Sequence, residues 1–97
     1  MGAYCYILHS EQLGKYYIGS TNMDPRERLE KHNTAFYGYN RFTASVNDWK
    51  ILLVITAVDS AHAIRIERKI KKMKSSKFII NLIAFPELIQ KVVHETK

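Results

Sequence analysis

Cysteine is almost absent from this 97-residue sequence. Cys5 is the only one, so an intrachain disulfide and a zinc site built from cysteines are both excluded. The neighbours of Cys5 are apolar, and we therefore expect a buried, unreactive thiol.

Long hydrophobic runs are missing as well. The longest nearly continuous apolar stretch, residues 49–58, is much shorter than the about 20 residues that a membrane-spanning helix needs. The N-terminus shows no signal-peptide pattern. We therefore expect a cytoplasmic protein that has no membrane partner.

Acidic residues are outnumbered by basic ones. The sequence has 9 Asp and Glu against 15 Lys and Arg, which gives a formal net charge of +6. On a small surface this charge favours a polyanionic partner, either nucleic acid or an anionic membrane face. A merely soluble basic protein has the same composition. With 46% hydrophobic and 25% charged residues, the chain is an ordinary globular one, long enough for a single domain over residues 1–97.

The hydrophobic pattern predicts an α/β (α+β) fold, a small three-stranded mixed sheet flanked by helices. Strands are expected at residues 3–8, 15–20 and 49–58, the third as a central strand buried on both faces. The first two are close enough in sequence to form an antiparallel hairpin. The element order is then β-β-α-β-α-α, with one more helix possible at the C-terminal end.

Capping residues mark the expected helix starts. A first helix begins at Asp24-Pro25 and runs to about residue 32, followed by a predicted loop over residues 33–48. The second is capped at residue 59 or 60 and carries an apolar stripe at helical spacing: Ala63, Ile66, Ile70 and Met73. Another helix is expected from Ser75-Ser76 to residue 82, and a last amphipathic segment from Pro86 onward.

The two N-terminal strands place two phenols on one face of the predicted hairpin. If Tyr6 pairs with Tyr17, the loop spans residues 9–14 and the two rings point to the same side. Gly19 then leaves space beside Tyr17, as a strand glycine does where a ligand approaches. The opposite face is more apolar, with Cys5, Ile7, Tyr16 and Ile18. These residues alone favour the plainer interpretation, a cross-strand aromatic pair that only stabilises the hairpin.

Arg28 and His32 lie four residues apart and therefore on one face of the first helix. The planar guanidinium of Arg28 can hold two phosphate oxygens. The imidazole of His32 can donate or accept a proton near neutral pH. Exposed arginines are more often only solvated, so this pair by itself does not establish a phosphate site.

Glu67 is the one acid within the basic stretch of the second helix. A carboxylate at the edge of a buried face can hold Mg²⁺, which commonly takes one or two protein carboxylates besides water and phosphate. The plainer interpretation is an ion pair with Lys71, four residues later. The basic residues either neutralise phosphates or form a solvated face: Arg65, Arg68, Lys69, Lys71, Lys72, Lys74 and Lys77.

Taken together, these residues resemble the GIY-YIG nuclease superfamily. The second motif is intact as Tyr17-Ile18-Gly19, eleven residues after Tyr6. In the first motif, Tyr4 and Cys5 stand where the family has Gly and Ile. The resemblance covers about residues 4–82 and is closest to small stand-alone bacterial members, in three stretches: residues 17–22, 28–33 and 63–77.

The resemblance implies a sheet of antiparallel type flanked by helices, and an endonuclease that cuts DNA with one divalent metal, Mg²⁺ or Mn²⁺. Family members act in DNA repair, restriction and intron mobility. The catalytic positions match Tyr6, Tyr17, Arg28 and His32, the structural motif matches Ile18 and Gly19, and the metal position matches Glu67. No organic cofactor is expected. DNA contacts are expected from the basic side chains: Lys15, Arg65, Arg68, Lys69, Lys71 and Lys72.

The identity of the general base and the function itself both stay open at this point. The general base can be Tyr6, His32 or Lys15. The rival function is a nucleic-acid-binding module on the same scaffold with little or no catalysis. The bases of the bound nucleic acid would then stack on aromatic side chains: Tyr4, Tyr37, Tyr39 and Phe42. A domain that binds a partner and has no role on nucleic acid is the third interpretation.

Overall fold

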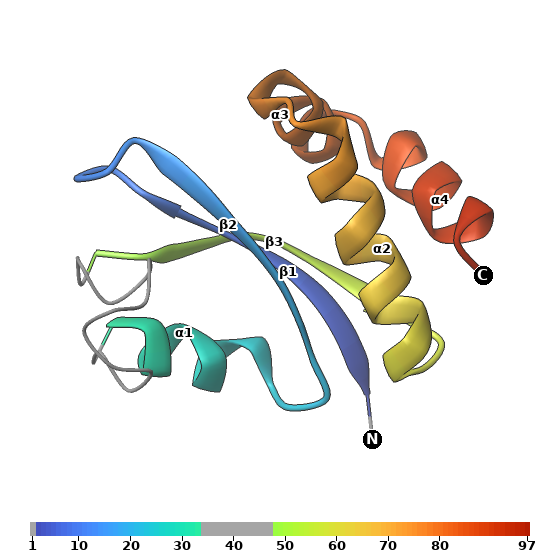
Figure 1. Cartoon of the computed structure of the whole chain (residues 1–97), viewed down its shortest axis with the longest axis horizontal. Helices are drawn as coiled ribbons and strands as arrows, with labels where there is room; N and C mark the ends of the chain where they lie inside the picture. Colours follow the sequence, from blue (N-terminus) through green and yellow to red (C-terminus); the bar gives the residue numbers. More distant parts are fainter. Residues whose placement is uncertain (1, 34–47) are drawn as a thin grey trace.

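The computed structural model describes residues 2–33 and 48–97. Along these residues the order is β-β-α-β-α-α-α (Figure 1), which confirms the predicted order and adds the last helix. The elements are β1 (Ala3–Ser10), β2 (Lys15–Thr21), α1 (Pro25–Asn33), β3 (Lys50–Ala57), α2 (Ser60–Met73), α3 (Ser76–Ala84) and α4 (Pro86–Glu95). Most of the predicted loop lies outside the described residues, as do three aromatic residues predicted to stack bases: Tyr37, Tyr39 and Phe42.

The sheet differs from the prediction in two respects. Both β2 and β3 pair antiparallel with β1, so the three strands form an antiparallel sheet rather than a mixed one. The order β2-β1-β3 makes β1 the central strand and places β3 at an edge. Leu52 and Val54 of β3 are accordingly 39% and 42% exposed, so this strand is not buried on both faces. A continuous apolar run does not distinguish a central strand from an edge strand whose outer face stays open.

The hairpin register is shifted by two residues from the predicted one. Tyr6 lies opposite Gly19, and Leu8 lies opposite Tyr17. The loop between the strands is correspondingly shorter, and it ends at Gly14, whose φ of 61° suits glycine. Because side chains alternate between faces with a period of two, a shift of two residues keeps Tyr6 and Tyr17 on the same face.

The helices cover the two faces of the sheet unequally (Figure 1). Helices α2, α3 and α4 pack on one face, where the main core forms: Cys5, Ile7, Ile55, Ile66, Ile70, Ile79, Leu82 and Val92. Helix α1 lies on the other face, where Tyr6, Leu8 and Trp49 form a smaller core. Cys5 is fully buried, as predicted, and burial raises the pKa of its thiol to about 12.

Local capping explains where the helices begin. The Asp59 carboxylate accepts a hydrogen bond from the His62 backbone N–H at 2.8 Å, and the Ser75 hydroxyl accepts one from Phe78 N–H at 3.2 Å. The predicted stripe on α2 is buried except for Met73, which is 47% exposed. Met73 is the last residue of α2, and the chain turns away at Lys74, whose φ is 48°, so its side chain is left outside the core.

His62 joins α2 to the end of β3 and to α4. Its Nδ1 accepts a hydrogen bond from Val58 N–H at 3.0 Å, so a neutral ring carries its proton on Nε2. Nε2 lies 3.0 Å from both Val93 O and Thr96 Oγ1. The ring is 1% exposed and fixes the C-terminal helix against the core. None of the helices in the described part of the chain has the length and apolarity needed to cross a bilayer.

Candidate active site

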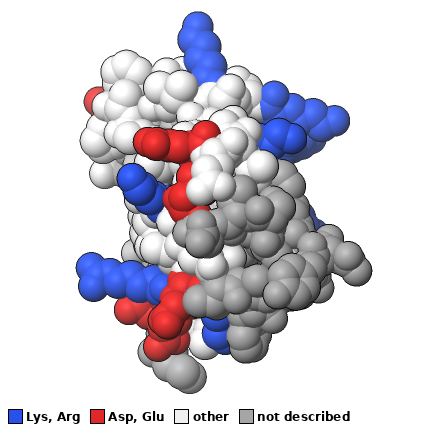
Figure 2. Space-filling view, turned by 90° about the vertical axis from the view of Figure 1, so that its left-hand side faces the viewer, with Lys and Arg blue, Asp and Glu red and all other residues white. Residues whose placement is uncertain are grey.

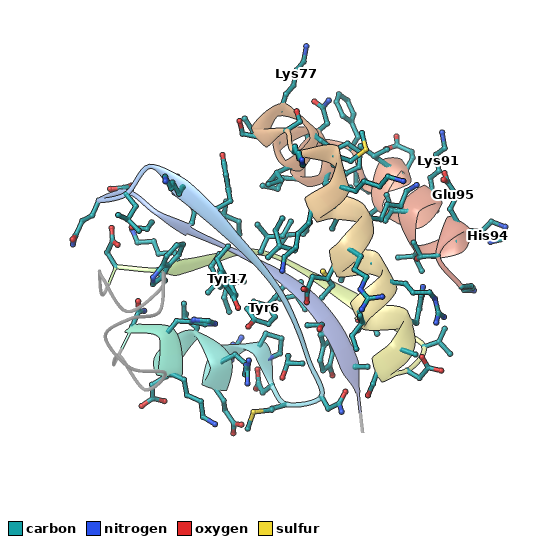
Figure 3. All side chains as sticks on the ribbon, in the orientation of Figure 1. Tyr6, Tyr17, Lys77, Lys91, His94 and Glu95 are labelled. Carbon is teal, nitrogen blue, oxygen red and sulfur yellow. The ribbon has the colours of Figure 1, made fainter. Side chains whose placement is uncertain are left out.

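Two tyrosines and a histidine gather on the face of the sheet that α1 covers. The Tyr6 hydroxyl and His32 Nε2 are 3.1 Å apart. The Tyr17 ring lies 4.6 Å from the His32 ring and 6.3 Å from the Tyr6 ring, measured between centroids. Figure 3 shows both phenols projecting from the strands toward α1. The structure thus brings together three of the residues that the sequence predicted to be catalytic.

Gly19 makes this arrangement possible. A Cβ at this position would lie 2.6 Å from the Tyr6 hydroxyl oxygen and 2.7 Å from its Cζ, much closer than atoms can pack. The ring of Tyr6 therefore lies across β2 in the space that the glycine leaves. The predicted register places this space beside Tyr17, open to a ligand, and the two-residue shift places it beneath Tyr6 instead.

Asn33 and Trp49 hold His32 and Tyr17 in place. The side chain of Asn33, at the end of α1, accepts from Trp49 N–H at 2.8 Å and donates to Trp49 O at 3.0 Å. The Trp49 ring stands edge-on to Tyr17 at 6.3 Å between centroids. Sequence reasoning missed both residues because a pairing across 16 positions leaves no local motif.

His32 is electrically neutral near pH 7. Burial lowers its pKa to about 4, and the positive charge of Arg28 acts in the same direction. A neutral ring with its proton on Nδ1 can accept the Tyr6 hydroxyl hydrogen at Nε2. Arg28 is partly buried while Arg26 is exposed, so Arg28 is the arginine of this helix that lies at the tyrosine site.

Glu67 lies apart from the tyrosines. It belongs to α2, on the other face of the sheet, where its negative charge contributes to the raised pKa of Cys5. Its Oε2 is 2.7 Å from the Lys71 ammonium, and its side chain is 19% exposed. The ion pair that the sequence allowed as the plainer interpretation is therefore present.

A hollow at the edge of β2 connects the two faces. It has a volume of about 360 Å³ and is lined by residues of β2, the β2–α1 turn, α1 and α2: Ser20, Thr21, Asn22, Met23, Arg28, Ser60, Ala63 and Ile64. The Ser60 hydroxyl donates to Asn22 Oδ1 at 2.6 Å and ties the turn to α2. Glu67 follows Ala63 by one helical turn. Arg28 therefore lines this hollow, and Glu67 lies one turn of α2 beyond its lining.

The residues present fit one kind of metal site. No group of three or more His, Cys, Asp and Glu that could bind a metal occurs within residues 2–33 and 48–97. Mg²⁺ does not need such a group, because it retains several waters and takes phosphate oxygens beside one or two carboxylates. Glu67 is a suitable single carboxylate, with the Lys71 ammonium as a competitor for Oε2.

The basic residues predicted to contact DNA differ in their neighbours. Two of them fasten the end of α4: Arg65 Nε donates to Thr96 O at 2.6 Å, and the Lys69 ammonium lies 3.2 Å from Glu95. Arg68 and Lys72 are exposed. Lys15 and Lys71 line a hollow of about 570 Å³ between the hairpin tip and the start of α3, together with Lys74. Figure 2 shows Lys and Arg side chains at the top, the upper right and the left of one face, with acidic side chains between those on the left.

Comparison with protein families gives one match. The family model of the GIY-YIG catalytic domain matches residues 2–81, from β1 into α3. No match was found among curated proteins or among solved structures.

Proposed function

Because the chain belongs to the GIY-YIG superfamily, we propose that it is a divalent-metal-dependent endonuclease that hydrolyses phosphodiester bonds of DNA. The matched catalytic domain implies nuclease-type activity on nucleic acids, and nucleases of this kind generally depend on a divalent metal. The observation that carries the proposal is the cluster of Tyr6, His32 and Tyr17, with a guanidinium beside it. A role in DNA repair or processing in the cytoplasm belongs to the same proposal.

In this mechanism Tyr6 removes the proton from the attacking water. A phenol becomes a base near neutral pH only if its own proton can leave. The imidazole of His32, 3.1 Å from the Tyr6 hydroxyl, accepts its hydrogen bond and orients the phenol. Because the pKa of His32 is lowered to about 4, this imidazole is too weak a base to take the proton of a phenol, whose ordinary pKa is about 10. The positive charge of Arg28 or of a bound metal ion therefore has to stabilise the phenolate. Tyr6 is 0% exposed while Tyr17 is partly exposed. The phosphate therefore meets Tyr17 first, and bound DNA has to displace the side chains that cover Tyr6 before water reaches it.

Arg28 and Glu67 take the two remaining roles. The guanidinium of Arg28 stabilises the negative charge that grows on the phosphoryl oxygens during the attack. Glu67 would hold the divalent ion, which when bound supplies positive charge for the leaving 3′ oxygen. The hollow that Arg28 lines at the edge of β2 is where we place the scissile phosphate.

DNA binding is assigned to the basic side chains that have no role in holding α4. Lys15, Lys71, Lys72 and Arg68 are exposed and can neutralise phosphates along the backbone. Arg65 and Lys69 are bonded to the last residues of α4, so their primary role is to hold that helix. Binding through backbone contacts predicts an affinity that falls steeply as salt rises, with little sequence preference.

Plasmid nicking in Mg²⁺ or Mn²⁺ tests the proposal. Tyr6→Phe removes the hydroxyl that contacts His32 and should lower the cleavage rate by about 10²–10⁴-fold, and Glu67→Ala should abolish metal-dependent cleavage. Tyr16→Phe is the matched control, because Tyr16 lies on the opposite face of the sheet, 4.9 Å from the His9 ring. Unchanged rates in both Tyr6→Phe and Glu67→Ala would exclude this mechanism.

One observation favours the rival function. Glu67 already has a cationic partner in Lys71, as expected for a basic nucleic-acid-binding module that needs no metal. Such a module would bind DNA equally well in EDTA and would yield no product with any divalent ion. Gel-shift and nicking assays on the same protein sample separate the two functions.

A further inference from the structure

A second hollow opens beside the tyrosine site, between the start of α1 and strands β1 and β3. It has a volume of about 660 Å³. We call it the Tyr4 pocket, and its lining is Gly2, Tyr4, Asn22, Asp24, Pro25, Arg26, Ile51 and Val54. Tyr4 lies two residues from Tyr6 on β1, so the two side chains leave the same face of the sheet from Cα atoms about 7 Å apart. The Tyr4 ring lies against Gly2 and the Tyr6 ring against Gly19. None of the residues given a catalytic role above lines this pocket.

The aromatic wall of the pocket is fixed by its surroundings. A Cβ on Gly2 would overlap the phenol of Tyr4, so only a glycine lets that ring lie across the N-terminal backbone. Tyr4 is partly buried, whereas Val54 on the facing strand is 42% exposed. The pocket thus presents an aromatic ring and branched aliphatic side chains to whatever enters it.

Hydrogen bonds also fix the polar wall of the pocket, which Asn22 and Asp24 form. Asn22 Oδ1 accepts the Ser60 hydroxyl hydrogen at 2.6 Å. Asp24 Oδ1 accepts from Arg26 N–H at 2.9 Å at the start of α1. An amide and a carboxylate therefore stand at defined positions opposite the aromatic ring, and both side-chain types hydrogen-bond the edges of bases.

This combination suits a nucleobase better than a phosphate. The lining carries one carboxylate, Asp24, and one guanidinium, Arg26, so it has no net positive charge to select an anion. Ile51 and Val54 form no hydrogen bonds with a phosphate. A base has a flat face that stacks on a tyrosine and a polar edge that pairs with amide and carboxylate groups. A base inside a duplex is stacked and paired on both sides, so it reaches such a pocket only when it is unpaired.

We propose that the Tyr4 pocket binds an unpaired nucleobase next to the phosphate that is cut, so that the substrate is DNA with a single-stranded nucleotide at the cleavage site. This inference rests on the proposed nuclease function for the position of the phosphate. Asn22 lines both the Tyr4 pocket and the hollow where Arg28 lies, so the two are adjacent. The strand then runs from the pocket to the hollow where Arg28 lies.

A binding experiment in EDTA tests the pocket without any turnover. The probes are a 5′-fluorescent oligothymidylate and an abasic deoxyribose-phosphate strand of the same length, which carries the same charge. Fluorescence anisotropy should show that the wild type prefers the thymidylate strand, and that Tyr4→Ala weakens its binding by about 5- to 150-fold. Tyr4→Phe keeps the ring and should retain the preference. Affinity for the abasic strand should be equal in all three proteins.

A second variant covers the case in which Tyr4→Ala does not fold. Val54 is largely exposed at the rim, so Val54→Glu should fold normally while it narrows the pocket and reduces the preference for thymidylate. Equal affinity of the wild type for the two strands, or thymidylate binding unaffected by Tyr4→Ala and Val54→Glu, overturns the pocket. Failure to nick any DNA overturns the nuclease proposal instead. The anisotropy experiment measures binding without cleavage, so its result does not depend on the nicking assay.

Discussion

Replacing Gly19 by alanine tests how the active site is built. The added Cβ would lie 2.6 Å from the Tyr6 hydroxyl oxygen, 2.7 Å from Cζ and 3.0 Å from Cε1. Tyr6 is fully buried, and its hydroxyl is 3.1 Å from His32 Nε2. The ring has to move off β2, and this movement breaks the contact with His32.

The expected cost follows from these two consequences. Overpacking a buried site costs about 1–3 kcal/mol, and losing a hydrogen bond costs about 0.5–1.5 kcal/mol, so Gly19→Ala should lower the free energy of unfolding by about 2–4 kcal/mol. When Tyr6 is replaced by a smaller side chain, Gly19→Ala should no longer lower the free energy of unfolding. In a Tyr6→Leu background the same change only replaces glycine within a strand, which is neutral or stabilising by up to about 1 kcal/mol.

Urea unfolding of the two single variants and the double variant measures this coupling. Gly14→Ala is the matched control, because Gly14 has a φ of 61° and nothing within 4 Å of an added Cβ. That variant should cost about 1–2 kcal/mol through the backbone, with or without Tyr6. If Gly19→Ala is neutral in the wild type, or equally costly in the Tyr6→Leu background, the close approach of Tyr6 to β2 is not what requires the glycine.

Three other predictions follow from individual residues. The pKa of His32 is lowered from its ordinary value of 6.5 to about 4, so the unfolded chain binds more protons between these values. The free energy of unfolding should therefore fall as the pH drops from 6.5 to 4, by at most about 1.4 kcal/mol per pH unit. Urea unfolding of His32→Gln over the same pH range should not show this decrease. Lys74→Gly should stabilise by about 1 kcal/mol, because Lys74 has a φ of 48° at the end of α2; an unchanged or lower melting temperature would contradict it. His62→Leu leaves Val58 N–H without its buried acceptor and should cost about 1–3 kcal/mol. Hydrogen exchange should then speed up in residues 86–95, and equal protection there would show that His62 does not hold α4.

The features that the sequence predicted correctly are those that local rules decide. Helix starts depend on a capping residue and its next few neighbours, which is why Asp59, Ser75 and Pro86 were sufficient to place α2, α3 and α4. The two phenols share a face although the register was wrong. Whether the two side chains share a face depends on the parity of the register, and an error of two residues does not change that parity.

The features that the sequence missed depend on contacts between distant segments. β3 lies at a sheet edge because both other strands precede it in the order β2-β1-β3. Its composition does not predict this position, because an apolar strand of this kind suits the centre of a sheet equally well. The bonds between Asn33 and Trp49 need α1 and β3 to lie side by side. Likewise, the motif order lists Glu67 with the tyrosines, but it carries no information on which face of the sheet α2 covers.

The position of Arg28 determines how the two halves of the candidate site can act together. Tyr6, Tyr17 and His32 lie on the α1 side of the sheet and Glu67 on the α2 side, so they can share a substrate only around the edge strand β2. Arg28 lines the hollow at that edge, and its charge is also felt at His32, whose pKa it lowers. In the proposed mechanism, a phosphate bound by this guanidinium would lie in the hollow between the end of β2 and the start of α2, and there it would meet both halves of the site.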